Sequence, residues 1–213
     1  IPALSNVLYS EDILFPIADF YLKKERWNEA IEVYEEMETI GALQGRGAEY
    51  YQKLGYALQK NKKYAEAIDA YLKADTLKPD NIWNNRHLAI CYRLNRNYQA
   101  ALSYYKKVEE ATPEDTNVIF HIGSCLAELG QYEEAMKYYE KIIEQKPLAI
   151  DYMNAGHVAW TMGDIQKAAA LYGKSITANG NRERFLEMFR KDKEALLKQG
   201  IQEEDIPLML DLL

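Results

Sequence analysis

Apolar residues recur along this chain with the spacing of an amphipathic α-helix. In one segment they fall at i, i+3, i+4 and i+7, and in a second segment, after a short turn, they fall at i, i+1, i+4 and i+7. The two segments comprise Tyr51, Leu54, Gly55 and Leu58, then Ala67, Ile68, Tyr71 and Ala74. Because this period buries one stripe of a helix, the pattern predicts two helices joined as a hairpin.

The hairpin pattern occurs five times. In each second helix a small residue is followed four positions later by a tyrosine: Ala30/Tyr34, Ala67/Tyr71, Ala101/Tyr105, Ala135/Tyr139 and Ala168/Tyr172. Successive alanines are 37, 34, 34 and 33 residues apart, so we expect a stack of hairpins rather than one closed core. Small residues in the first helices are expected to let paired helices approach closely, at Ala18, Gly55, Ala89, Gly123 and Gly156.

One unit matches a known repeat pattern at nearly every marked position. The segment AEYYQKLGYALQKNKKYAEAIDAYLKADTLKPDN at residues 48–81 resembles the tetratricopeptide repeat, and the resemblance covers roughly Glu11 to Arg182. It implies an all-α fold, a right-handed superhelical solenoid of about five hairpins with a C-terminal capping helix. The first unit departs from the pattern around GALQGRG, the third has Asn85 where a large apolar residue is usual, and the fifth has Gly180 where proline is expected.

These patterns divide the chain into three parts. We expect residues 1–10 to be the tail of a preceding element, 11–182 to form the array, and 183–213 to form a capping helix and an apolar tail. The expected repeats lie near 11–47, 48–81, 82–115, 116–148 and 149–182. Since the chain opens at Ile1 with IPALSNVLYS, we interpret it as a piece of a longer protein.

The C-terminal part predicts an amphipathic cap. Phe185, Phe189 and Leu196 lie along one side of a helix that Gly200 ends, as an open repeat array requires at its last unit. A second short helix is expected to start at Asp205 and carries Ile206, Leu208, Met209, Leu210, Leu212 and Leu213. We expect this tail to fold back on the cap; the alternative is an exposed patch that docks into a neighbour or the rest of the protein.

Charge and composition limit the classes of partner. The net charge is −7 and the sequence pI is near 5.2, which opposes binding to a nucleic acid backbone. Apolar stretches fall short of the roughly 18 residues that a membrane-spanning helix needs.

The two cysteines are expected to be free thiols. Cys91 and Cys125 share a phase in adjacent units, where neighbouring helices lie roughly 8–10 Å apart, too far for a disulfide. Buried thiols suit a reducing compartment, so we favour the cytoplasm.

Sequence motifs of catalysis and metal binding are missing from this chain. It has no glycine-rich phosphate loop, nucleophile elbow or histidine pair at i, i+4. Its three histidines are His87, His121 and His157, and one repeat step separates the first two too widely for a shared metal. We predict no catalytic residue, no metal and no cofactor.

The resemblance implies that a peptide or protein partner lies in the concave groove, between the packing residues of the first helices. Carried over by phase, the expected groove residues are Phe15, Asp19, Leu22, Gln52, Tyr56, Gln59, Arg86, Ile90, Arg93, Phe120, Ser124, Ala127, Met153, His157 and Trp160. Arg86 and Arg93, flanked by Tyr56 and Phe120, suit an acidic side chain beside an apolar one. In the alternative interpretation Ile90 and Trp160 are core plugs and the arginines balance nearby glutamates.

One subgroup of the family clamps chaperone carboxylate tails with asparagine and lysine. This chain has Tyr56, Ile90 and Ser124 at the asparagine positions and Gln52 at the first lysine position, so we do not expect that ligand. The predicted function is a noncatalytic interaction scaffold. The alternatives are a self-association module, forming a homodimer through the C-terminal tail, and a regulatory segment of a larger enzyme.

Overall fold

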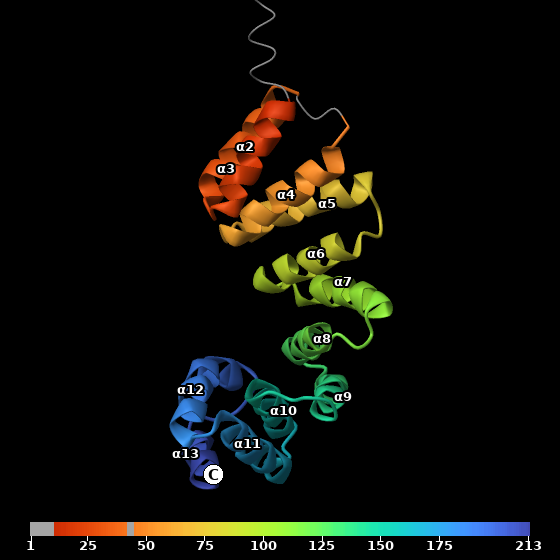
Figure 1. Ribbon diagram of the computed structural model, residues 1–213. Coiled ribbons are helices and arrows are strands. Elements are labelled where there is room, and N and C mark those ends of the chain that lie inside the picture. Colours follow the sequence, from red (N-terminus) through yellow and green to blue (C-terminus); the bar gives the residue numbers. More distant parts are fainter. Residues whose placement is uncertain (1–10, 42–44) are drawn as a thin grey trace, which may run out of the picture. The chain divides into compact units, whose positions relative to one another are not determined.

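The computed structural model describes residues 11–41 and 45–213, and the regular elements in these residues are all α-helices (Figure 1). They are α2 (Glu11–Lys23), α3 (Trp27–Thr39), α4 (Gly47–Lys60), α5 (Tyr64–Leu77), α6 (Ile82–Leu94), α7 (Tyr98–Ala111), α8 (Thr116–Glu128), α9 (Tyr132–Ile143), α10 (Ala149–Thr161), α11 (Ile165–Asn179), α12 (Arg182–Lys198) and α13 (Asp205–Asp211). The predicted tail at 1–10 and part of the GALQGRG segment lie outside the described residues.

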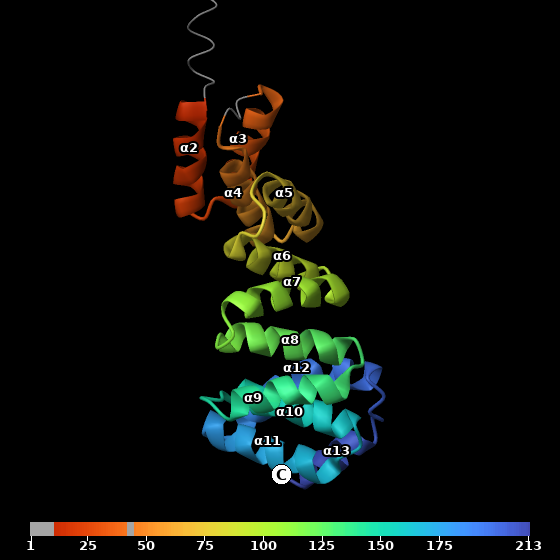
Figure 2. The same ribbon diagram turned by 90° about the vertical axis from the view of Figure 1, so that its right-hand side faces the viewer.

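Contacts divide the chain into two compact units, Ile1–Val108 and Glu109–Leu213. In the first unit, α2 packs on α3 and α4 on α5, while α3 also contacts α4 and α5 contacts α6. Helices α6 and α7 lie side by side (Figures 1 and 2), and the rings of Tyr92 and Tyr104 stack between them with centroids 5.6 Å apart. Each helix therefore packs on its neighbours in the chain, as expected of a hairpin array.

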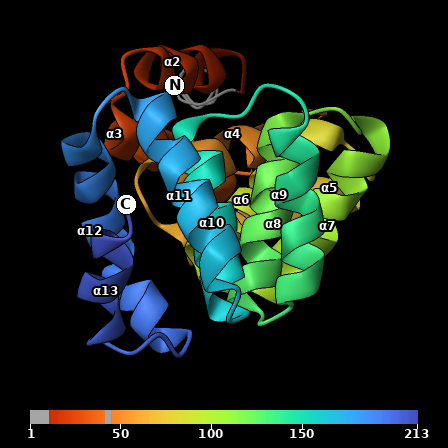
Figure 3. The same ribbon diagram turned by 90° about the horizontal axis from the view of Figure 1, so that it is seen from below.

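The second unit continues the pairing and ends in the cap. Helix α8 packs on α9 and α10 on α11, and α12 contacts both α10 and α11 (Figure 3). The predicted cap residues Phe185, Phe189 and Leu196 are buried. Helix α13 buries Ile206 and Met209, and the Arg182 guanidinium donates a hydrogen bond to the Leu210 carbonyl at 2.7 Å. Two residues of the apolar tail are thus buried, whereas Leu208 and Leu212 are exposed, and the expectation that the tail folds back on the cap stays a prediction.

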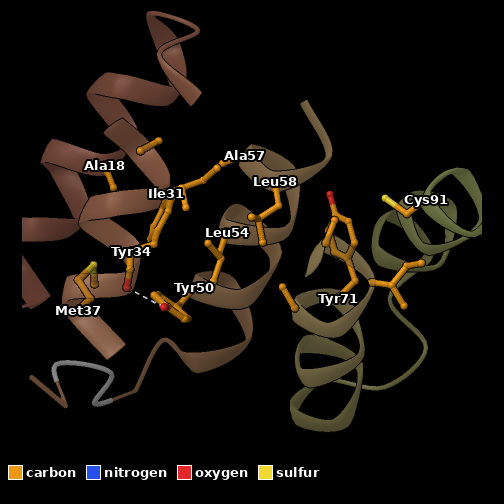
Figure 4. Packing of buried hydrophobic residues seen from close by; sticks show 14 of the residues in the cluster. Ala18, Ile31, Tyr34, Met37, Tyr50, Leu54, Ala57, Leu58, Tyr71 and Cys91 are labelled. Carbon is orange, nitrogen blue, oxygen red and sulfur yellow. Dashed lines mark hydrogen bonds between the residues drawn. The ribbon is translucent and has the colours of Figure 1, made fainter. Parts of the chain in front are cut away.

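The recurring alanines and tyrosines form the packing face of the second helices. All five alanines and all five tyrosines are buried. In the first unit, Tyr34 and Tyr50 lie within a continuous core, where the Tyr50 hydroxyl donates to the Tyr34 carbonyl at 2.7 Å (Figure 4). The sequence prediction that these residues hold the hairpins together is confirmed.

The glycines of the first helices make room for these tyrosines. A Cβ atom on Gly55 would lie 2.8 Å from Tyr71 Cε1, and one on Gly156 would lie 2.5 Å from Tyr172 Cε1. Contacts this short are not tolerated between carbon atoms. The predicted close approach of paired helices is therefore confirmed at both hairpins.

Candidate functional site

Three predicted groove residues are core residues instead. Phe15, Met153 and Trp160 are 1%, 1% and 4% exposed, while Ala127 and His157 are also buried, at 8% and 7%, but line a pocket. The Phe15 ring packs edge-on against Tyr34 with centroids 6.0 Å apart, and the Trp160 ring stacks on Phe189 of the capping helix at 6.3 Å. Their side chains are covered by neighbouring helices, so the expectation that they face a ligand is wrong. For Trp160 the alternative interpretation, a core plug, is the correct one.

In the first unit, two predicted groove residues are engaged by neighbouring side chains. The Asp19 carboxylate pairs with the Lys53 ammonium at 2.7 Å. The Gln59 carbonyl oxygen accepts a hydrogen bond from the Tyr71 hydroxyl at 3.0 Å and lies 2.7 Å from His87 Nδ1. Burial, with the charges of Lys60 and Arg86, lowers the pKa of His87 to about 4. His87 is therefore neutral at pH 7, and its Nδ1–H donates to Gln59.

The remaining groove residues of the first unit are half-buried: Leu22, Gln52, Tyr56, Arg86, Ile90 and Arg93. The Tyr56 ring contacts Trp27, Trp83 and His87, with centroids 5.7–6.3 Å apart. These aromatic rings pack largely against one another, so their contacts serve the packing of the unit and do not define a ligand.

A pocket of about 190 Å³ lies in the second unit between α8, α10 and α12. We call it the α8/α10/α12 pocket. It is lined by Ser124, Ala127, Glu128, Tyr139, Asn154, His157, Val158, Asp192, Ala195, Leu196 and Gln199. The structure thus brings together three predicted groove residues, Ser124, Ala127 and His157, and the capping helix closes the wall opposite them.

A chain of hydrogen bonds crosses the wall of this pocket. His157 Nδ1 lies 2.8 Å from the Tyr172 hydroxyl, and Nε2 lies 3.3 Å from Asp192 Oδ2. Burial, and secondarily the Asp192 charge, raises the pKa of Tyr172 well above 10. Tyr172 therefore keeps its proton. Because the Asp192 carboxylate accepts only, Nε2 carries the N–H that donates to it, and in the neutral ring Nδ1 then accepts a hydrogen bond from the Tyr172 hydroxyl. This arrangement fixes both the imidazole tautomer and the position of the carboxylate.

Ser124, His157 and Asp192 all line the pocket, which invites comparison with a nucleophilic triad. In such a triad one histidine nitrogen accepts the serine proton and the other donates to the carboxylate. Here Tyr172 and Asp192 occupy the two ring nitrogens of His157. The ring therefore has no nitrogen for the Ser124 hydroxyl, and the geometry is that of a fixed polar wall rather than an activated nucleophile.

A second hollow, of about 410 Å³, lies between α8 and α10 near their N-termini. Phe120 is the predicted groove residue that lines it, together with His121, Lys146, Leu148 and Asp151 among others. The Asp151 carboxylate accepts a hydrogen bond from the Leu148 backbone N–H at 2.6 Å, so its charge serves the start of α10. Phe120 and Ser124 thus face different hollows, although one helical turn separates them.

The repeat pattern of the sequence does not predict the contribution of α12 to the pocket. Asp192, Ala195, Leu196 and Gln199 lie at i, i+3, i+4 and i+7, which is one helical face. This spacing is visible in the sequence, but the face is mixed in polarity and the pattern of the segment predicts a cap alone. Asn154 and Glu128 are also missed, because they lie one position beside the groove phase taken from the family.

We searched the described residues for metal-ligating clusters and for membrane-spanning helices. Within residues 11–41 and 45–213, no group of three or more His, Cys, Asp or Glu side chains could hold a metal ion. Over the same part of the chain, no helix is long and apolar enough to cross a membrane. Cys91 and Cys125 are buried thiols, and burial raises the pKa of Cys91 to about 12.

Helical hairpins that pack on one another within each unit, followed in the second unit by an amphipathic helix over the last hairpin, are the architecture of a helical-repeat fold. Models of the tetratricopeptide repeat match residues 14–44, 48–81, 93–155 and 152–182. The chain belongs to the tetratricopeptide repeat family, as the resemblance predicted.

Solved structures agree on the fold. YrrB, described as a tetratricopeptide repeat protein with an unusual peptide-binding site, is 22% identical, with a TM-score of 0.74, and the match covers 89% of this chain and 96% of YrrB. MamA from Desulfovibrio magneticus RS-1 is 18% identical, with a TM-score of 0.72, and the match covers 79% of this chain and 94% of MamA. A comparison with curated proteins gives no significant match.

Proposed function

We propose that this chain is a noncatalytic scaffold that binds an extended peptide segment of a partner protein, and that the α8/α10/α12 pocket receives one side chain of that segment. The observation that carries the proposal is the convergence of Ser124, Ala127 and His157 on one pocket. The family phase assigns these three positions to the ligand face independently of the pocket.

The size of the pocket supports a side chain as its occupant. At about 190 Å³ it is smaller than the roughly 300–1,000 Å³ typical of sites that hold whole small molecules. The net charge of −7 favours a protein over a nucleic acid as the partner. The peptide-binding site named for YrrB is a property of that protein, and it supports the same class of ligand here.

The test is a pocket-filling substitution with a matched control. Peptides would be selected from a random peptide library displayed on phage, using the full chain as bait. We expect Ala195→Phe, on the pocket wall, to abolish binding of the selected peptides, and Ala178→Phe, at an exposed position of α11, to leave it unchanged. Circular dichroism would establish that both variants stay folded. Selection of no peptide, or peptides insensitive to Ala195→Phe, would contradict the proposal.

Self-association is a second candidate, and α13 favours it. Leu208 and Leu212 are 64% and 63% exposed and lie at i, i+4, so they form a small apolar stripe. We expect a Leu208→Glu variant to lower the mass measured by sedimentation equilibrium at high protein concentration, with Gln202→Glu as the control. A monomer mass for the unmodified chain would contradict self-association.

The third alternative, a regulatory segment of a larger enzyme, stays a prediction about residues outside this sequence.

A further inference from the structure

The α8/α10/α12 pocket is unbalanced in charge. Glu128 of α8 and Asp192 of α12 both line it, and the lining residues of the described chain include neither lysine nor arginine. Among the other polar lining groups, which include Tyr139 and His157, Ser124, Asn154 and Gln199 each offer an oxygen that accepts hydrogen bonds. The charged groups that line the pocket are therefore both acidic, and hydrogen-bond acceptors lie beside them.

Asp192 is held in place for such a contact. Its Oδ2 accepts one hydrogen bond, from His157 Nε2 at 3.3 Å, whereas an ionised carboxylate has about four acceptor positions. The side chain is 37% exposed, so it remains accessible to a ligand. Because Tyr172 fixes His157 from the opposite side, binding a ligand at Asp192 requires little further ordering of the protein.

The basic residues next to Asp192 along α12 do not neutralise the pocket. Lys193 pairs with Glu203 at 2.6 Å, and Lys191 is exposed and does not line the pocket. The field of the whole second unit has the same sign, since residues 109–213 contain 19 of the 33 acidic residues but 11 of the 26 basic ones. A positively charged group is attracted both at long range and at contact.

We infer that the pocket receives the cationic head of a lysine or arginine side chain of the bound peptide, with Asp192 as its principal ion-pair partner and Glu128 as the second. Ammonium and guanidinium groups carry three and five donors, which match the carboxylate and carbonyl oxygens of the walls. This inference rests on the proposed function, because it names the chemistry of the side chain that the same pocket takes.

The test uses the peptides selected on phage and uncharged replacements of their basic residues. In one arm arginine is replaced by citrulline and lysine by acetyl-lysine, which separates the two cations as sources of the interaction. In the other arm the protein carries Asp192→Asn or Glu128→Gln. Each change removes a charge at nearly constant shape, and the amide introduced by Asp192→Asn keeps a carbonyl oxygen for His157. The matched control is Glu187→Gln, on an exposed part of α12 that does not line the pocket.

We expect the uncharged peptides and the Asp192→Asn variant each to bind about tenfold to a hundredfold more weakly, the range for hydrogen bonds to charged groups. Glu187→Gln should stay within about twofold. An uncharged peptide should bind the Asp192→Asn variant about as weakly as either change alone makes the pair bind, because both changes remove the same contact. Binding of the unmodified pair should also weaken as salt is raised.

The outcomes separate the two proposals. Selected peptides that lose binding with Ala195→Phe but show no preference for lysine or arginine would overturn the inference and leave the proposed function standing. Peptides with basic residues whose affinity is unchanged by Asp192→Asn and Glu128→Gln would also overturn it. If no peptide is selected, or if Ala195→Phe has no effect, both proposals are wrong.

Discussion

In three hairpins a glycine of the first helix faces a tyrosine of the second helix. A Cβ atom would lie 2.5 Å from the Tyr172 ring at Gly156, 2.8 Å from Tyr71 at Gly55, and 3.3 Å from Tyr139 at Gly123. The clearances differ although the role is the same. The three hairpins therefore tolerate an added methyl group to different degrees.

We expect Gly156→Ala to lower the free energy of unfolding by about 1–3 kcal/mol, the usual cost of overpacking a core, and Gly123→Ala to lower it by less. Urea unfolding followed by circular dichroism would measure both. Gly173→Ala is the control, because a Cβ atom there meets nothing within 4 Å. It should stabilise α11 by about 0.5–1 kcal/mol. Equal effects at positions 123 and 156 would contradict the packing argument.

His87 predicts a pH dependence of stability. Burial lowers its pKa to about 4, against about 6.5 in an unfolded chain. Between these values the unfolded chain binds the proton and the folded chain does not, so the free energy of unfolding falls as pH is lowered from about 6.5 toward about 4. The contribution is at most about 3 kcal/mol. His87→Gln retains a donor for Gln59 but cannot titrate.

The measurement is urea unfolding between about pH 4 and pH 7 for both proteins, which spans the two pKa values. The difference in stability between His87→Gln and the unmodified chain should move in favour of the variant as pH falls. The carboxylates titrate in both proteins, so their contribution cancels when the two free energies of unfolding are subtracted. Parallel curves would show that His87 titrates near its ordinary pKa in the folded chain.

Helix α12 carries two faces with different tasks. Phe185, Phe189 and Leu196 are buried and cover the last hairpin, while Asp192 and Gln199 line the pocket. Leu196 belongs to both sets. Pocket geometry therefore depends on the docking of α12 against α10 and α11, which the aromatic residues of the first face supply.

We expect Phe189→Ala to cost about 3–5 kcal/mol of stability, as for other buried phenylalanines. The Phe189 ring contacts His157, Trp160, Tyr172 and Phe185, with centroids 5.5–6.3 Å apart. Its loss should also increase hydrogen exchange in α12. Arg190→Ala, at the exposed neighbouring position, is the control and should change stability by less than about 0.5 kcal/mol. Unchanged exchange in α12 would contradict the role of this face.

At the scale of the whole molecule, each compact unit holds its own core. The first contains Trp27 and Trp83 and the second contains Trp160. In an array where repeats contact their neighbours, stability is approximately a sum of local terms. Damage to one unit should therefore be reported most strongly by the tryptophan of that unit.

In a Trp27→Phe, Trp83→Phe background, fluorescence reports Trp160 alone. We expect Gly156→Ala to lower the urea midpoint seen by Trp160, and Gly55→Ala to lower it less. Far-UV circular dichroism should respond to both substitutions, since it follows the helices of both units. Identical Trp160 midpoints for the two variants would mean that the units unfold as one cooperative body.

The repeat phase is sufficient to predict the hairpins, because the alanine and tyrosine positions are dictated by local packing. The repeat phase is not sufficient to predict which residues face a ligand. Phe15, Met153 and Trp160 lie at positions that the repeat pattern assigns to the groove, yet their side chains are buried by tertiary contacts. For Trp160 the contact is with the capping helix, and no repeat pattern specifies how that helix docks. Asp192 shows the converse, since it reaches the pocket from outside the repeats. Long-range placement of α12 is the information that the repeat phase lacks.

Because the cap also forms a wall of the pocket, the number of repeats and the lining of the pocket are linked. A hairpin duplicated after α11 would preserve every packing rule of the array, and α12 would close the new end equally well. Asp192 would then face the added hairpin, while His157 would keep Tyr172 and lose its carboxylate. Growth of the array at this end would therefore separate Asp192 from His157, whereas a graft that keeps the pocket whole would have to carry α8 to α12 together, because Ser124, Ala127 and Glu128 lie on α8.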